Sequence, residues 1–205
     1  MHPIWIQHPV VLTGQRVALR PLEAGDLDDL YAVACDPEIW KLTSVDYSVR
    51  DVFYPNFTAA LEDRRGGRAY PFLILDRASA RIIGTTRLLD IHPADRRLEI
   101  GVTWMAPAYW GSGANMECKF LLLRYCFEVL QAHRVQFRAK ADNQRSRRAL
   151  EKIGASFEGV HRKDKIEPGG TPRNTAFYSI VDDEWPAIEA TLAAKLARVG
   201  ATERA

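Results

Sequence analysis

The chain has 205 residues, of which 47% are hydrophobic and 26% are charged, and its formal net charge is +2. This length and composition predict one folded domain with a sizeable core and argue against a disordered or fibrous protein. The small net charge gives no reason to expect a polyanionic partner, and no apolar run approaches the roughly 18 residues needed to cross a membrane.

The N-terminus and the cysteines set further expectations. The first residues lack the basic and apolar regions of a signal peptide, so we expect a cytoplasmic protein with no membrane anchor. Cys35, Cys118 and Cys126 form no CxxC pair and have no histidine at metal-ligand spacing, so no metal site is expected. Cys118 and Cys126 are eight residues apart in an apolar helix, which predicts buried thiols. Residues 1–12 are expected to be an N-terminal extension, and residues 13–200 a single domain.

Seven strands and five helices are expected along this domain. A strand at 15–22 is followed by a helix that Asp26 caps and by a second helix that opens with a capping box of Ser48 and Asp51. The long helix at about 116–131 carries a polar stripe that includes Glu117. The other predicted elements are strands at 70–76, 81–91, 97–104, 135–141, 156–165 and 173–181, a helix at 146–153 and a terminal helix from Asp183. This order predicts a mixed α/β (α+β) fold with one seven-stranded sheet and helices on both faces.

The segment Leu98–Asn115 is the most informative part of the chain. It reads as a strand, a break at Pro107 and a glycine-rich turn that leads directly into the long helix. Such a turn aims several unpaired backbone N–H groups at one point, and the helix dipole adds positive potential there. The segment therefore predicts a phosphate-binding turn, although roughly half of such turns are only tight connections.

A second motif downstream gives the glycine turn its context. Asn143-x-x-Ser146 opens a short helix that ends with Lys152-x-Gly154. Together with the glycine turn, this pattern resembles the GNAT superfamily of acyl-CoA-dependent N-acetyltransferases, and most of all its ribosomal-protein N-terminal acetyltransferases. Other shared segments, within roughly residues 13–185, are Arg20-Pro21-Leu22, Ile82-Ile83-Gly84, Glu99-Ile100-Gly101 and Asp183-Glu184-Trp185. The resemblance implies a GNAT fold with a splayed central strand pair, and acetyl-CoA as co-substrate.

The resemblance also implies a coenzyme site. The family motif Q/R-x-x-G-x-G/A falls on residues 108–113, where Ala108 departs from it, which should weaken coenzyme binding without abolishing it. A bulge near Trp104–Met105 would splay the strand from its parallel neighbour, and a backbone N–H near Met105 would polarise the thioester carbonyl. The residues expected to bind the coenzyme are Trp104, Met105, Trp110, Gly111, Ser112, Gly113, Ala114, Asn115, Asn143 and Ser146.

Two residues are expected to carry catalysis. Many family members place a tyrosine before the Glu-Lys pair of the last core helix, but this chain has Leu150 there. In the ribosomal branch a serine protonates the departing thiolate instead, and Ser146 has that position. The alternative is that Ser146 only helps to start the helix. Glu99 is the first candidate for the base that deprotonates the acceptor, and the alternative is a structural carboxylate that pairs with an arginine.

The acceptor side is less specific. Asp164 and His161 are secondary candidates for the base, and solvent water could also serve. We expect Trp40, Glu99 and Asp164 to contribute to the acceptor site, although Trp40 could equally pack on the sheet. The basic residues between Arg134 and Lys152 either attract the coenzyme's 3′-phosphate or form a solvated face, and no nucleic-acid-binding motif accompanies them.

Three functional interpretations stay open. The first is an N-acetyltransferase that passes an acetyl group directly from acetyl-CoA to a primary amine, either a protein N-terminus or a small molecule. The second is a catalytically degenerate domain that binds acyl-CoA as a regulatory protein, which the missing Q/R and tyrosine support. The third, a nucleotide-binding protein of another class, lacks the Gly-Lys-Ser/Thr and GxGxxG motifs. A monomer or a homodimer is expected.

Overall fold

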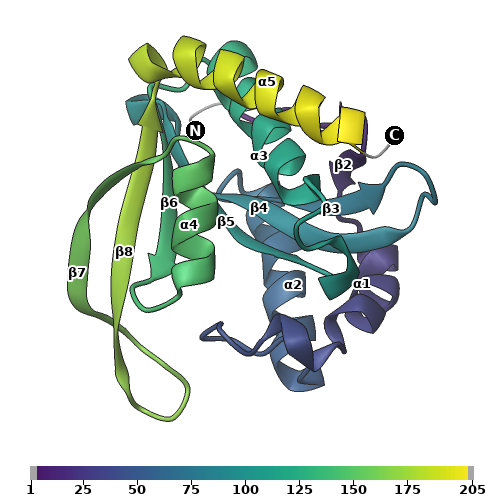
Figure 1. Cartoon of the computed structure of the whole chain (residues 1–205). Helices are drawn as coiled ribbons and strands as arrows, with labels where there is room; N and C mark the ends of the chain where they lie inside the picture. Colours follow the sequence, from purple (N-terminus) through teal and green to yellow (C-terminus); the bar gives the residue numbers. More distant parts are fainter. Residues whose placement is uncertain (1–3, 203–205) are drawn as a thin grey trace.

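A computed structural model of the protein describes residues 4–202 (Figure 1). Within these residues the backbone forms one eight-stranded mixed sheet in the order β1-β2-β3-β4-β5-β6-β8-β7. The strands are β1 (Leu12–Thr13), β2 (Val17–Pro21), β3 (Tyr70–Asp76), β4 (Ile82–His92), β5 (Arg97–Met105), β6 (Arg134–Lys140), β7 (Ser156–Ile166) and β8 (Pro172–Val181). The helices are α1 (Leu27–Ala34), α2 (Arg50–Arg65), α3 (Ala114–Arg124), α4 (Gln144–Lys152) and α5 (Trp185–Thr202).

Helices cover both faces of the sheet. α1 and α2 lie on one face, where Leu30, Phe53 and Leu73 are fully buried between these helices and the strands. α3, α4 and α5 lie on the other face, where Leu122 and Leu192 reach into the larger core (Figure 1). The predicted mixed α/β class with helices on both faces is confirmed.

The sheet has one strand more than the seven predicted for the chain. Within the described residues, Leu12 and Thr13 pair with Leu19 and Ala18 of β2 and so form β1. The residues before β1 also belong to the packed structure, because Ile6 and Val10 are 4% and 7% exposed and lie in the larger core. A two-residue strand has too short a pattern to be seen in the sequence.

Two predicted helix caps are wrong. The Asp26 carboxylate does not cap α1; it accepts two hydrogen bonds of 2.7 Å from the guanidinium of Arg20. Ser48 does not cap α2 either, because its hydroxyl donates to Asp46 and the N-cap residue is Val49, which provides no side-chain cap. In the first case a two-pronged ion pair, which adds a full positive charge to two hydrogen bonds, takes the place of the cap.

Glu117 is buried in the core, contrary to its predicted place on a polar stripe of the long helix. Its side chain is 5% exposed, and its carboxylate accepts the backbone N–H groups of Gln15, Arg16 and Val17 at 2.7 to 2.8 Å. These donors lie at the first residue of β2 and in the two residues before it. The predicted helix also changes character near its end, where Tyr125–Val129 forms a π-helical turn after α3.

The central feature of the sheet is the separation of its two parallel neighbours. The ladder between β5 and β6 ends at the pair Glu99–Gln136, whereas β5 continues to Met105 and β6 to Lys140. We call the space between the unpaired segments 100–105 and 137–140 the interstrand gap. The predicted splayed strand pair is thus present.

A β-bulge precedes the end of β5. Between the pairs Arg87–Gly101 and Thr85–Trp104, β4 advances by two residues and β5 by three. The additional residue is accommodated at Val102, whose φ of 48° is left-handed. The sequence placed the bulge later, at Trp104–Met105, but these residues pair regularly with β4 again.

Candidate functional site

A backbone N–H group points into the interstrand gap from β5. The carbonyl of Trp104 faces β4, because a Cβ placed on Gly84 would lie 2.1 Å from its oxygen. The N–H of Ala106, two residues after Trp104, also faces β4 and donates to the carbonyl of Ile83 at 2.8 Å. In a trans peptide the N–H is opposite to the carbonyl, so the N–H of Met105 points away from β4 and toward β6. The site therefore has one oriented donor for an oxygen in the gap.

The glycine-rich turn lies at the end of this gap and starts α3. Gly111 and Gly113 have φ values of 79° and 87°, which only glycine adopts without strain. Gly113 is the N-cap residue and gives no side-chain cap, so the first-turn N–H groups of Asn115 and Met116 have no partner inside the helix. The turn can hold an anion at this helix terminus.

A cation–π contact connects the two sides of the site. The indole of Trp110 is 41% exposed and donates from Nε1 to the carbonyl of Met105 at 3.0 Å. The guanidinium carbon of Arg145, on α4, is 4.2 Å from the centroid of the Trp110 ring. The turn after β5 and the helix after β6 are therefore held together.

The helix start after β6 is capped by Asn143. Its Oδ1 accepts the N–H of Ser146 at 3.0 Å, and its Nδ2 donates to the carbonyl of Leu42 at 2.8 Å. Both polar ends of the Asn143 side chain are thus engaged within the protein. The hydroxyl of Ser146 makes no hydrogen bond to any described residue and does not act as the cap.

Glu99 is buried where β5 and β6 separate. Its side chain is 4% exposed and its Oε2 lies 2.5 Å from Nε of Arg138 and 3.2 Å from Nε2 of Gln136. Burial raises the pKa of the carboxyl above its usual range, and the positive charge of Arg138 opposes that rise. This is the pairing that the structural alternative for Glu99 anticipates.

The other acceptor candidates lie apart from Glu99. Asp164 is on β7, which β6 and β8 separate from β5, and its Oδ1 is 3.9 Å from Nδ1 of His161. Trp40 is 7% exposed, donates to the carbonyl of Ala34, and packs edge-on against Trp104 with ring centroids 5.2 Å apart. The structure brings Trp40 to the bulged strand but does not bring Asp164 to Glu99.

Two buried cations near the gap were not predicted from the sequence. Lys119 is 5% exposed, and burial lowers the pKa of its ammonium to about 8. Arg87 is 8% exposed; it donates to Oδ1 of Asn56 at 3.1 Å and lies over the ring of Phe57. The sequence signal that could have indicated a buried Lys119 is its place among the apolar positions of the long helix.

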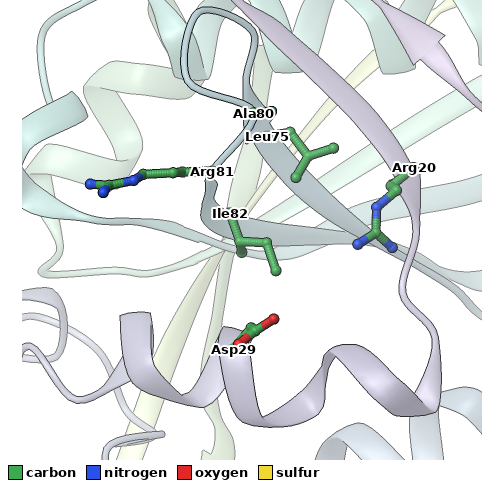
Figure 2. A pocket seen from close by; sticks show the side chains of 6 residues that line it. All are labelled: Arg20, Asp29, Leu75, Ala80, Arg81 and Ile82. Atoms are coloured by element: carbon green, nitrogen blue, oxygen red, sulfur yellow. The ribbon is translucent and has the colours of Figure 1, made fainter.

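Features elsewhere add no second candidate. The pocket in Figure 2 lies between α1 and the β2–β4 part of the sheet, and none of its lining residues belongs to the predicted site. Across residues 4–202 no group of three or more His, Cys, Asp or Glu side chains could hold a metal ion. No helix in that range is long and apolar enough to cross a bilayer.

Known proteins share this architecture. The crystal structure of a GCN5-related N-acetyltransferase from Brucella melitensis matches with a TM-score of 0.82 and 30% identity, over 91% of this chain and 85% of that one. RimJ of Mycobacterium smegmatis, in complex with CoA-disulfide, matches with a TM-score of 0.76 and 26% identity, over 95% of this chain and 97% of that one.

The sequence comparisons agree with the structural ones. YdaF of Bacillus subtilis, named as a proposed ribosomal N-acetyltransferase, is 32% identical over 104 residues, or 51% of this chain and 56% of that protein. The family profile described as "Acetyltransferase (GNAT) domain" matches residues 16–156, which include β5, the glycine turn and α4. This chain therefore belongs to the GNAT acetyltransferase family.

Proposed function

We propose that this protein transfers an acetyl group from acetyl-CoA to a primary amine by direct attack of the amine on the thioester. The observation that carries the proposal is the combination of the interstrand gap, the inward N–H of Met105 and the glycine turn at the start of α3. The turn would hold the pyrophosphate through backbone N–H groups, and the gap would receive the pantetheine arm and the acetyl group.

The backbone supplies the main electrostatic help in this proposal. As the amine nitrogen bonds to the carbonyl carbon, negative charge develops on the thioester oxygen, which the N–H of Met105 is placed to receive. A preorganised donor of this kind commonly contributes several kcal/mol to an acyl transfer. The intermediate then collapses as the carbon–sulfur bond breaks and its electron pair remains on sulfur.

Ser146 and Glu99 are the side chains proposed for proton transfer. The hydroxyl of Ser146 is unused by the described residues, which supports a role in giving a hydrogen bond or a proton to the departing sulfur. Glu99 would take the proton of the attacking amine through water. Its ion pair with Arg138 supports this role because the positive charge opposes the rise in pKa that burial causes.

The acceptor is proposed to be a protein N-terminus or a small-molecule amine. The name of YdaF supports the first, and the N-terminus of a ribosomal protein is the narrower form of that proposal. The acceptor would enter on the α2 face, beside Trp40 and Glu99. Nothing in the comparisons supports a catalytically degenerate regulatory domain.

The deciding experiment measures release of free CoA thiol from acetyl-CoA with a panel of N-terminal peptides, polyamines, aminoglycosides and amino acids. Acetyl-CoA binding is measured separately by calorimetry. We expect binding and amine-dependent thiol release with at least one acceptor class. Binding without release from any class would favour the regulatory alternative, and absence of binding would overturn the proposal.

A further inference from the structure

Lys119 lies beneath the interstrand gap. Its Nζ donates to Oγ1 of Thr103, on β5, at 2.7 Å and lies 5.9 Å from the centroid of the Phe137 ring, on β6. Both partners belong to the segments in which β5 and β6 no longer pair. The ammonium of a side chain that is 5% exposed therefore bridges the underside of the gap from α3.

The ammonium has unused donors at this position. An ammonium carries three N–H donors, and the bond to Thr103 is the only hydrogen bond that the described residues make with them. The Thr103 hydroxyl also shares a hydrogen bond of 2.8 Å with Oγ1 of Thr86, in which either oxygen can be the donor. Two donors of Lys119 therefore have no partner among the described residues.

No acidic side chain forms an ion pair with Lys119 within the described residues. Its neighbours Cys118 and Cys126 are buried thiols whose pKa values are raised, the first to about 12, so both are neutral at physiological pH. The negative charge of Glu99, on β5, raises the pKa of Lys119, but the Glu99 carboxylate is paired with Arg138. A buried cation without a counter-ion is costly to a fold, and an anion in the gap would remove that cost.

A second unsatisfied group lies one helical turn before Lys119. Asn115 and Lys119 are four residues apart on α3 and so share a helix face. Oδ1 of Asn115 is buried and has no hydrogen-bond partner. From the glycine turn onward, α3 thus presents an unused acceptor and then a cation that forms no ion pair with the described residues.

We propose that Lys119 stabilises the coenzyme sulfur as a thiolate, with its ammonium beneath the sulfur in the interstrand gap. The inference rests on the acetyl transfer proposed above. When the carbon–sulfur bond breaks, the electron pair stays on sulfur, and the ammonium stabilises that charge while keeping its own three protons. The proton that finally neutralises the thiolate comes from Ser146 or from water.

The test measures the ionisation of the thiol of CoA when it is bound to the protein. The thiolate absorbs in the ultraviolet, and its absorbance is followed from pH 6 to 9 with desulfo-CoA as the blank. A cation near the sulfur lowers a thiol pKa by about one unit or more. We expect this shift in the wild type and in Lys195→Met, a matched substitution of an exposed lysine on α5, and its loss in Lys119→Met.

Calorimetry with CoA and desulfo-CoA separates charge stabilisation from a structural role. We expect the wild type to bind CoA about 3-fold more tightly than desulfo-CoA at pH 8, because a thiol pKa lowered from about 8.5 to about 7.5 raises the thiolate fraction of the bound coenzyme only in part at this pH. Lys119→Met should remove this preference and leave the affinity for desulfo-CoA unchanged. Equal weakening of both ligands would instead mean that Lys119 only holds Thr103 in place.

The outcomes distinguish this inference from the proposed function. A normal thiol pKa for CoA bound to the wild type overturns the inference, whether or not a Lys119 variant folds. Amine acetylation by the wild type together with an unchanged thiolate shift in Lys119→Met or Lys119→Gln overturns the inference alone. Failure of the wild type to bind CoA and desulfo-CoA overturns the proposed function itself.

Discussion

Replacing Gly111 by valine should cost the protein most of its affinity for acetyl-CoA. Gly111 has a φ of 79°, and a Cβ added there would meet no heavy atom within 4 Å. The Cβ of the new side chain therefore lies in open space. It would occupy the space in which a pyrophosphate approaches the backbone of the turn.

Gly170 offers a matched control for the strain of this substitution. It lies in the β7–β8 hairpin with a φ of 86°, and a Cβ there also meets nothing within 4 Å. A residue with a Cβ in this left-handed region costs about 1–2 kcal/mol. Gly111→Val and Gly170→Val should therefore lose similar amounts of stability.

Coenzyme affinity should separate the two variants. If Gly111→Val displaces the pyrophosphate from one or two backbone N–H groups, the loss is about 1.5–3 kcal/mol for each charge-assisted hydrogen bond. This corresponds to an increase in Kd of about 10-fold or more, because 1.4 kcal/mol is a factor of ten. Calorimetry gives the affinity and urea unfolding gives the stability. Equal Kd values for the two variants would refute the phosphate-binding role of the turn.

Three other variants, with one control variant, test the remaining parts of the site and of the fold. Ser146→Ala should lower kcat by about 10- to 1000-fold with little change in acetyl-CoA affinity or in stability, and wild-type turnover would contradict its role at the sulfur. Glu99→Gln should lower kcat most at low pH, where the amine is largely protonated, and recover as pH rises. Because burial raises the pKa of Glu99, the wild-type acid limb should lie above the usual range for glutamate, and a pH–rate profile unchanged by the substitution would make Glu99 structural. Arg138→Gln, which breaks the same ion pair but keeps the carboxylate, is its control. Glu117→Ala should reduce the free energy of unfolding in urea by about 3 kcal/mol or more, since three backbone N–H groups lose their acceptor; a loss below about 1 kcal/mol would contradict this.

The elements that local patterns define could be predicted from the sequence. The strand at 70–76 has the predicted bounds, because a short apolar run between turn residues is a local signal. The glycine turn was equally local, since left-handed φ values at Gly111 and Gly113 require no distant partner. The helix start at Asn143 also followed from its own residues, although the capping side chain belongs to Asn143 and not to Ser146.

The pairing of distant groups was decided by the tertiary structure. Glu117 accepts the N–H of Gln15, 102 residues away, so the helical pattern around Glu117 could not show that it is buried. Asp26 pairs with Arg20 on the preceding strand, a choice that a local capping pattern does not contain. In each case a charged group is satisfied by a donor from another element, and burial makes that partnership decisive.

The sequence by itself determined the order of the five helices and of the seven longer strands, the glycine turn and the likeness to acyltransferases, because each depends on residues that are neighbours in the chain. Only the tertiary structure decided what lies around the interstrand gap. Register with β4 placed the bulge at Gly101–Trp104 and turned the N–H of Met105 toward β6. Packing of α3 across the sheet brought Lys119 beneath two diverging strands, because a helix that covers a splayed pair must bury whatever side chain faces the opening.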